Sequence, residues 1–440
     1  MDSIWIKGGL VYTGGDSPRV IQGGVLCRGD NIEAVGSDDE LGNMADGAQV
    51  VNAGGRLIVP GFINAHMHLY STLARGMSLQ GPPPENFIQI LERLWWRLDK
   101  ALELDDLIPS AQLPLADALL SGVTTVIDHH ASPNAISGSL DVLADEAAKL
   151  GVRFSTCYEV SDRDGPETMK AGIEENLRFA KRASSDPMLA ATFGLHASFT
   201  LSDESLDECA QAVQDAGLPV HVHVAEALSD ARDSVDRGYE GPLARLHSLG
   251  VLPEGSLAVH CVHTNEHEWE IMSQADIYCV HNPQSNMNNS VGATRVAEMI
   301  GAGVNVGVGT DGMQADVRQD IRAAFLLGHH GTGDPRTMWS ETGDLLSTNR
   351  RIASGLFGKN LGVLEPGAAA DVVVYDYFPP TELNVENFLG HLLFGLYQAR
   401  ADAVVVAGVM RVSNGEILGY DAAGASDIAR QKASLLWRRV

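Results

Sequence analysis

Eight short apolar runs, most of them followed by a helical pattern, recur through the middle of the chain. They lie near residues 58–64, 123–127, 153–158, 190–195, 219–224, 256–262, 276–280 and 304–309. Between them, stretches such as GSLDVLADEAAKLGV and DESLDECAQAVQDAGLPV carry the apolar spacing of amphipathic helices. Strand–helix units of about 30 residues are typical of parallel α/β folds. Eight of them predict an α/β fold closed into a (β/α)₈ TIM barrel.

The two ends of the chain follow a different pattern. Short β-rich runs broken by Gly and Asp, such as GGVLCRGDNIEAVG, fill roughly the first 57 residues and return in GAAADVVVYDY and ADAVVVAGVMRVSNGEIL. Such runs are typical of small antiparallel sheets. We therefore expect a composite β-sandwich domain from residues 1–58 and 366–420, a barrel over residues 59–365, and a C-terminal helix over residues 421–440.

The charge of the chain excludes several classes of partner. The sequence has 57 acidic residues against 31 Lys and Arg, a net charge of −26, so we expect binding neither to nucleic acid nor to a membrane. Its five cysteines are scattered and lack CxxC spacing, which argues against a disulfide framework or a cysteine metal site. Since the sequence shows neither a secretion signal nor an apolar run of about 18 residues, we expect a cytoplasmic protein.

His66 and His68 stand two residues apart after the apolar run LIVPGFINA. Side chains i and i+2 of a strand point to the same face, so a strand that ends near Ala65 would project both imidazoles together from its carboxyl end. That geometry suits one metal ion. Two nearby histidines more often serve packing, so other ligands are needed to support a metal site.

Further histidines and acidic residues follow other predicted strands, and the carboxyl ends of barrel strands share the rim where active sites lie. They are His221, His223 and Glu226 in HVHVAE, His260 and His263 in AVHCVH, and Asp311 in VGVGTDG. Three histidines and one carboxylate suit zinc, or another divalent ion such as Fe²⁺, with a position left for water. The predicted ligands are His66, His68, His223 and Asp311.

The sequence also bears on the number of metals and on the acid–base groups. No lysine occurs between Lys181 and Lys359 to form the carbamylated bridge that two-metal barrels often use, so we expect one divalent ion per chain.

Glu226, three residues after His223, is placed to shuttle protons without binding the metal, as a glutamate does in zinc deaminases. His260 would orient the activated water and stabilise charge on the substituents of the attacked carbon. His263 is the second candidate for this role.

Taken together, these motifs resemble the amidohydrolase superfamily, in the branch of cytosine, guanine and triazine aminohydrolases and chlorohydrolases. The matching elements are PGFINAHMHL, HVHVAE, AVHCVH, VHNPQSNMNN, GVGTDG and LGVLEPGAAADVVVYD, which span nearly the whole chain in the family's order. NFIQILERLWWRLDKAL and VIDHHASP are most similar to SsnA-type aminohydrolases. The resemblance implies a barrel with a composite β-sandwich, a single bound metal and homo-oligomerisation. It assigns the metal-ligand role to His66, His68, His223 and Asp311 and the proton-transfer role to Glu226. It also implies that His260 is the catalytic histidine of the sixth strand.

The expected reaction is hydrolytic deamination of a small amino-substituted N-heterocycle, purine- or pterin-like, with Glu226 and Asp311 accepting the proton of the attacking water. The alternatives are hydrolysis of a cyclic amide or of a C–Cl bond, and a non-catalytic scaffold of the same fold. Candidate substrate contacts lie just after strands or in loops: Gln80, His130, Glu159, Arg163, His196 and Asn286. His196 in GLHASFT is the strongest of them, whereas His129 and His130 are equally suited to hydrogen-bonding the strand ends.

Overall fold

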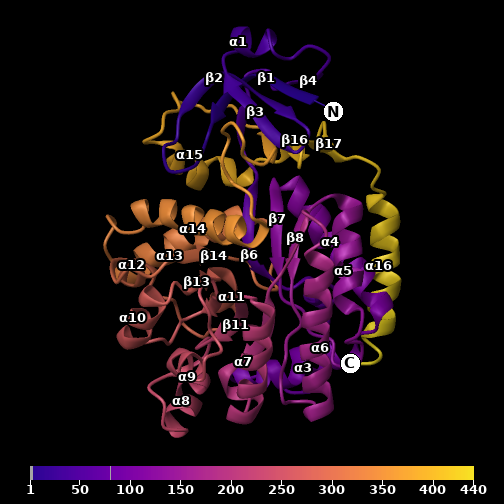
Figure 1. Ribbon diagram of the computed structural model, residues 1–440, viewed down its shortest axis with the longest axis vertical. Helices are drawn as coiled ribbons and strands as arrows, with labels where there is room; N and C mark the ends of the chain where they lie inside the picture. The colour runs from indigo at the N-terminus through magenta and orange to yellow at the C-terminus, as the bar shows by residue number, and fades with distance from the viewer. Residues whose placement is uncertain (1–2, 80) are drawn as a thin grey trace.

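The computed structural model describes residues 3–79 and 81–440. A small β domain built from both ends of the chain lies at the top of Figure 1, and a larger body of strands and helices lies below it. The last helix returns along the side of that body. The predicted (β/α)₈ barrel with a small β domain from both termini is confirmed.

A single mixed sheet forms the small domain, in the order β18-β17-β16-β15-β5-β1-β2-β3, with β4 pairing with β1. A bridge between Asn31 and Ala369 brings the start of β3 to the segment before β15, so the sheet curls around an apolar core. Its strands are β1 (Ser3–Tyr12), β2 (Val20–Arg28), β3 (Asn31–Gly36), β4 (Gln49–Asn52), β5 (Leu57–Pro60), β15 (Val372–Tyr375), β16 (Ala401–Val406), β17 (Val409–Ser413) and β18 (Glu416–Ile417).

The barrel consists of two parallel arcs, β6-β7-β8-β9 and β10-β11-β12-β13-β14. Bridges between Val160 and Leu195 and between Met67 and Asp311 join the arcs, which closes the barrel. The strands are β6 (Phe62–Met67), β7 (Val123–Asp128), β8 (Arg153–Thr156), β9 (Leu189–Ala191), β10 (Phe193–Ala197), β11 (Val220–Val224), β12 (Leu257–His260), β13 (Tyr278–His281) and β14 (Val306–Val308). They are almost entirely buried, as expected of parallel strands covered by helices.

Helices connect the barrel strands. They are α4 (Leu104–Leu120), α5 (Ser139–Leu150), α6 (Pro166–Ala183), α7 (Asp203–Ala216), α8 (Leu228–Asp236), α9 (Pro242–Ser248), α10 (Glu266–Gln274), α11 (Pro283–Asn288), α12 (Val296–Gly301), α13 (Val317–Thr332) and α14 (Trp339–Phe357). In α5, Leu140, Leu143, Ala147 and Leu150 form the buried stripe, and Gly151 ends the helix at φ 74°, a left-handed conformation that glycine adopts without strain.

Short helical segments complete the chain: α1 (Asp38–Gly42), the 3₁₀ turns η1 (Leu69–Ala74), η3 (Ser198–Thr200) and η4 (Leu396–Gln398), α15 (Phe388–Phe394) and α16 (Ala422–Leu436). The segment NFIQILERLWWRLDKAL forms α2 (Phe87–Ile90), a π-helical turn η2 (Leu91–Trp95) and α3 (Trp96–Ala101). We call this segment, residues 87–101, the roof segment, because its side chains line the cavity described below.

The apolar run expected to form one strand near residues 58–64 forms two. Leu57–Pro60 is β5 of the terminal sheet, while Phe62–Met67 opens the barrel as β6. The chain passes between the two sheets at Gly61, where a Cβ atom would lie 2.1 Å from the Thr124 hydroxyl oxygen, so the crossing needs glycine. Because β6 continues beyond Ala65 to Met67, His66 lies inside the strand and His68 directly follows it.

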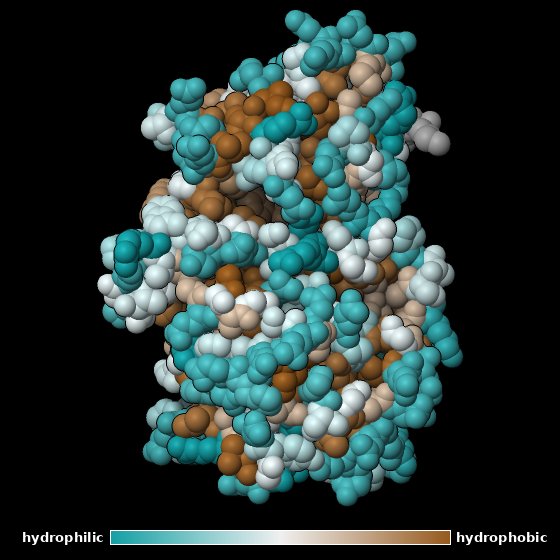
Figure 2. Space-filling model, turned by 60° about the vertical axis from the view of Figure 1, so that its left-hand side comes forward, coloured by the Kyte–Doolittle hydropathy of each residue, from teal (hydrophilic) through white to brown (hydrophobic). Residues whose placement is uncertain are grey.

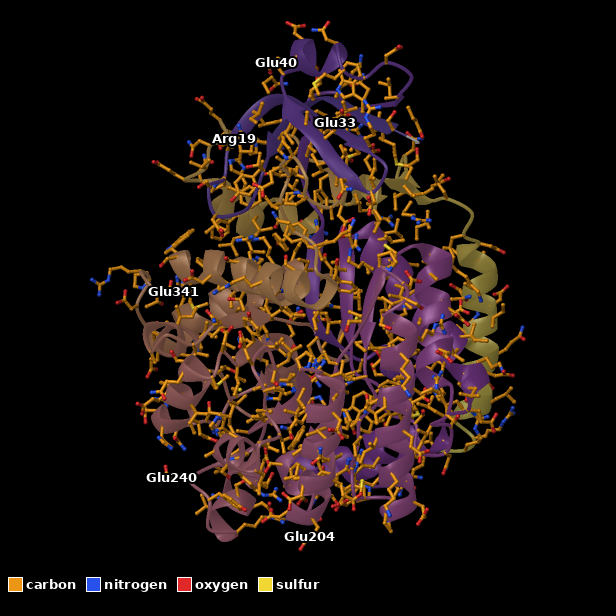
Figure 3. All side chains as sticks on the ribbon, in the orientation of Figure 1. Arg19, Glu33, Glu40, Glu204, Glu240 and Glu341 are labelled. Carbon is orange, nitrogen blue, oxygen red and sulfur yellow. The ribbon has the colours of Figure 1, made fainter. Side chains whose placement is uncertain are left out.

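The surface agrees with the acidic composition. Hydrophilic residues cover most of the lower part of the face shown in Figure 2, and Glu40, Glu204, Glu240 and Glu341 lie at the outer edge of the molecule in Figure 3. Within residues 3–79 and 81–440, no helix combines the length and the apolar character needed to cross a membrane.

We predict that Arg153→Met destabilises the protein strongly. Arg153, 1% exposed on β8, faces Asp371 beside β15, with Nη2–Oδ1 and Nε–Oδ2 distances of 3.3 Å. Methionine would leave the Asp371 carboxylate buried without its cation, which should lower the free energy of unfolding by about 3–5 kcal/mol. Urea denaturation measures this loss. Arg336→Met, at an exposed pair with Asp334, is the control and should leave the unfolding midpoint unchanged; equal midpoints for the two variants would contradict the prediction.

Candidate metal centre

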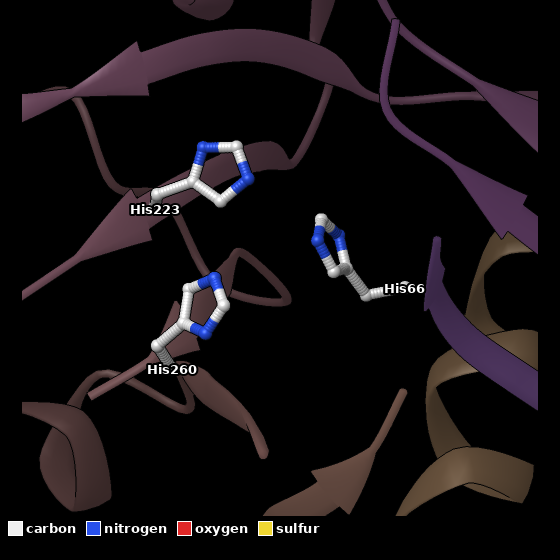
Figure 4. Close-up of side chains that lie close together, drawn as sticks. All are labelled: His66, His223 and His260. Carbon is white, nitrogen blue, oxygen red and sulfur yellow. The ribbon is translucent and has the colours of Figure 1, made fainter. Parts of the chain in front are cut away.

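Three imidazoles converge at the mouth of the barrel. His66 on β6, His223 on β11 and His260 at the end of β12 face one another in Figure 4. The His66 ring centroid lies 5.3 Å from that of His223, which lies 5.6 Å from that of His260. His68 and Asp311 complete the cluster, with 3.2 Å between His68 Nε2 and Asp311 Oδ1. Residues far apart in the sequence therefore present nitrogen and oxygen atoms to one point.

Backbone carbonyl groups fix the tautomers of two of these histidines. His68 Nδ1 donates to the carbonyl oxygen of His129 at 2.6 Å, and His223 Nδ1 donates to that of His196 at 2.8 Å. In a neutral ring the Nε2 atom then carries a lone pair. The two Nε2 atoms lie 3.2 Å apart, so two lone pairs face each other, an arrangement that a cation between them would stabilise. A hydrogen bond from Nδ1 to a carbonyl is typical of metal-binding histidine.

His66 provides a third nitrogen. Its Nδ1 lies 2.8 Å from His221 Nε2, while its buried Nε2 has no hydrogen-bond partner among the described residues. Burial, reinforced by neighbouring imidazoles, holds the pKa values of His66 and His223 well below the usual range. Both rings are therefore neutral, as metal ligands must be. The donors present fit a divalent metal ion.

The chain turns sharply where three barrel strands end. Ala225, His260 and Asp311 adopt φ values of 49°, 72° and 53°, in the left-handed region that residues other than glycine seldom occupy. Each follows or ends a strand that contributes to the centre, namely β11, β12 or β14. Such conformations persist only where the surrounding structure enforces them, and they cluster at functional sites.

Two carboxylates lie beside the imidazoles. His260 Nε2 is 3.5 Å from Glu226 Oε2 and 3.7 Å from Asp311 Oδ2, while His260 Nδ1 donates to Asn286 Oδ1 at 2.8 Å. Burial, together with the negative charge of Asp311, raises the pKa of Glu226 well above its usual value. Burial alone would also raise the pKa of Asp311, but the imidazoles of His68 and His260 and the Ser285 hydroxyl hold it below its usual value. Two adjacent carboxyl groups with opposite pKa shifts suit proton transfer.

A cavity opens over this cluster. Its roof and walls are largely aromatic or apolar, formed by Phe87, Leu91, Trp95, Trp96, Phe199 and Met313. The tryptophan pair of the roof segment therefore lines the cavity. On one wall, Arg163 Nη2 donates to Glu159 Oε1 at 2.5 Å and its guanidinium lies over the ring of Trp96, 5.2 Å from the centroid. A pocket that combines aromatic walls with polar groups able to orient a ligand is typical of a site for a small planar molecule.

The predicted substrate contacts fall into two groups. His196, Glu159 and Arg163 line the cavity. His130 and Asn286 are fully buried and are not among the described residues that line it; His130 Nε2 bonds to the Ser132 hydroxyl. Gln80 lies outside the described residues. His263, ranked behind His260, is turned toward the Val291 carbonyl oxygen, 2.8 Å from its Nε2.

Some residues of the cavity do not stand out in the sequence motifs, among them Asp99, Ser285 and Asn289. Asp99, 2% exposed, has an Oδ1 atom with no hydrogen-bond partner within the described part of the chain. Ser285 and Asn289 line the cavity near the two carboxylates. The only available signal for Asp99 was its position three residues after Trp96, on one face of a helix. Ser285 and Asn289 lie in VHNPQSNMNN, the motif that also holds the predicted contact Asn286, and this motif was the signal that could have found them.

The sequence matches a known protein family over most of its length. A model of the amidohydrolase family matches residues 57–413. The chain is similar to a 5-methylthioadenosine/S-adenosylhomocysteine deaminase of Moorella thermoacetica, with 28% identity over 412 residues that cover 92% of this chain and 93% of that protein.

Solved structures share the fold. An adenosine deaminase from Xanthomonas campestris with bound zinc superposes with a TM-score of 0.86 and 23% identity, covering 100% of this chain and 99% of that one. An atrazine chlorohydrolase from Arthrobacter aurescens, complexed with zinc, gives a TM-score of 0.80 and 24% identity over 98% of this chain and 100% of that one. At these identities the likeness establishes the architecture alone.

We predict that zinc stabilises the folded protein through the facing imidazoles. A ligand that binds only the folded state adds about 2.7 kcal/mol at a free concentration 100 times its dissociation constant. Zinc added to chelator-treated protein should therefore raise the melting temperature, and His223→Ala should largely abolish the increase. His247→Ala, at an exposed histidine of α9, is the control and should preserve it. An undiminished zinc response in His223→Ala would contradict the assignment.

Proposed function

Because the chain belongs to the amidohydrolase family, we propose that it catalyses the hydrolytic deamination of a small amino-substituted N-heterocycle, purine- or pterin-like. The observation that carries this proposal is the meeting of Glu226, His260 and Asp311 at one edge of the imidazole cluster, beneath an aromatic cavity. The curated relative named above is a deaminase and aligns over nearly the whole chain. Family membership confirms the resemblance inferred from the motifs.

The proposed metal ligands are His66, His68, His223 and Asp311, which would hold one divalent ion, zinc in preference to Fe²⁺. Support comes from the unpaired Nε2 of His66, the facing Nε2 atoms of His68 and His223, and the Asp311 oxygen 3.2 Å from His68. Zinc is also present in the two structural neighbours. When bound, such an ion lowers the pKa of a water molecule toward neutrality and so supplies hydroxide at pH 7.

The residues of the chain handle the protons. Asp311 and Glu226 take the proton from the attacking water, and His260, held by Asn286, orients that water through Nε2. Glu226 then delivers a proton to the ring nitrogen beside the carbon that is attacked. The tetrahedral adduct collapses with cleavage of the C–N bond as Asp311 takes the proton of its hydroxyl group, and the amino group gains that proton and leaves as ammonia. The reaction as a whole consumes one water molecule, forms one carbonyl group and releases one molecule of ammonia.

The cavity favours a flat ligand with hydrogen-bonding groups at its edge. His196 Nδ1 donates to the Thr200 hydroxyl at 2.7 Å, and burial lowers the pKa of His196 to about 3. The ring is therefore neutral, and its Nε2 is a hydrogen-bond acceptor for the substrate. Asp99 provides an unpaired oxygen on the same cavity, with Trp96 beside it available for stacking.

A substrate screen tests the proposed reaction. Purines, pterins, pyrimidines and triazines that carry an amino group are incubated with metal-loaded protein, and ammonia is measured. Release of ammonia with formation of the oxo product supports deamination. Ring opening or chloride release without ammonia would instead favour the cyclic-amide or chlorohydrolase alternative, and the absence of both turnover and bound metal would favour a scaffold.

We predict close to one divalent metal per chain. The proposed ligand set holds a single ion, and the sequence provides no lysine between residues 181 and 359 to bridge a second. Elemental analysis of protein expressed with added zinc should give a ratio of about one. Two tightly bound ions per chain, or none, would contradict the proposed centre.

We predict that Glu226→Gln retains the metal but loses turnover. Glutamine preserves the shape of the side chain and removes its ability to accept and deliver a proton. General acid–base groups contribute about 10²- to 10⁴-fold in rate, so kcat should fall by at least that order. Metal loss would make Glu226 a ligand, whereas a rise in KM with an unchanged kcat would limit its role to substrate binding.

A further inference from the structure

One asparagine contacts Glu226 through the carboxylate oxygen that is not the one near His260. Asn289 follows the short helix α11, and its Nδ2 donates to Glu226 Oε1 at 3.2 Å. The backbone N–H of Asn289 donates to the Ser285 carbonyl oxygen at 2.8 Å, which anchors its backbone to the helix. The other oxygen of Glu226, Oε2, is the one that lies 3.5 Å from His260 Nε2. The amide therefore occupies one carboxylate oxygen while the second faces the reaction centre.

The orientation of this amide is determined by its neighbours. Asn288 Nδ2 donates to Asn289 Oδ1 at 3.1 Å, so the oxygen of the Asn289 side chain is already engaged and its nitrogen is directed toward Glu226. In this orientation both polar atoms of the Asn289 side chain are hydrogen-bonded, Oδ1 to Asn288 and Nδ2 to Glu226. Asn289 thus presents a donor to Glu226.

The same nitrogen connects Glu226 to the second carboxylate. Asn289 Nδ2 lies 3.4 Å from the Ser285 hydroxyl oxygen, and that hydroxyl donates to Asp311 Oδ2. Oxygen atoms of Glu226 and Asp311 and a nitrogen of His260 lie within 4.8 Å of one another. Asn289 and Ser285 therefore form a chain of hydrogen bonds that joins the two acidic side chains, one donor to each.

We propose that Asn289 is a positioning residue that holds Glu226 by Oε1, so that Oε2 stays directed at the atoms between which it moves a proton. The inference rests on the proposed deamination and deepens it, since it assigns the orientation of the proton-transferring group to a residue outside the metal cluster. Because this hydrogen bond holds the group that moves the proton, its removal should be felt in the chemical step.

Kinetics of single and double variants test this role. Asn289→Leu removes the donor at similar volume and should lower kcat about 10- to 100-fold, with KM changed less than about 3-fold and metal content unchanged. Asn289→Gln retains a donor and should recover part of kcat. In a Glu226→Gln background, Asn289→Leu should cause no further loss, because a residue that acts through Glu226 has nothing left to position. If the leucine variant does not fold, Asn289→Ala replaces it.

A matched control separates this role from helix capping. Asn43 follows helix α1 as Asn289 follows α11, and it is exposed and belongs to the terminal domain. Asn43→Leu should leave kcat and KM unchanged. The inference is overturned if Asn289→Leu raises KM alone, if it loses metal, or if its effect on kcat is the same with and without Glu226.

Crystallography provides a readout that does not depend on turnover. In metal-loaded Asn289→Leu, the Glu226 carboxylate should leave its position beside His260 while the four proposed ligands stay in place. A Glu226 side chain that does not move would overturn the inference. If the wild-type protein releases no ammonia from any compound tested, the proposed reaction fails, and the displacement of Glu226 still decides whether Asn289 positions it.

Discussion

Backbone carbonyl groups at the ends of barrel strands control the chemistry of the centre, because they fix the protonation pattern of its histidines. The carbonyl oxygens of His129 and His196 each accept a hydrogen bond from an imidazole Nδ1–H, which leaves the Nε2 lone pairs of His68 and His223 facing each other. The strands that carry these carbonyls belong to the barrel, so its closure and register set which nitrogen is available for a metal. The tautomers of His68 and His223 are therefore a consequence of backbone geometry.

The last residues of the chain contact the roof segment and the turn before it. The roof segment follows the strand that carries His66, and the C-terminal segment contacts it from outside. Trp437 Nε1 donates to the Leu73 carbonyl oxygen at 2.7 Å, and Arg439 Nε donates to that of Ala101 at 2.9 Å. Since Leu73 lies in the turn η1 and Ala101 is the last residue of the roof segment, the last residues of the chain hold both η1 and the carboxyl end of the roof segment. A buried ion pair between Arg153 and Asp371 ties the opposite part of the barrel to the terminal sheet.

Several features of the site were predictable from the sequence because they depend on local periodicity. A parallel strand places its final side chains at a known rim, so His66, His223, His260 and Asp311 were assigned to one site before their distances were known. The barrel fold was predictable from the regular alternation of strand and helix patterns. The split at Gly61 was not predictable, because Leu57–Pro60 pairs with β1 and β15, both far away in the sequence, and a short apolar run does not reveal its partners.

By itself, the sequence determined the residue types at each strand end, and these limit the chemistry to imidazole and carboxylate groups around a metal. Only the tertiary structure decided which of them face the cavity. His130 follows β7 closely and Asn286 lies in the helix after β13, yet they are turned to Ser132 and to His260 and are used for support, whereas His196 of β10 lines the cavity. Asp99 and Asn289 come from segments outside the strand pattern and reach the site through helix packing. The reason is physical: periodicity fixes the direction of a side chain relative to its own strand, whereas contacts between distant elements fix what that side chain meets.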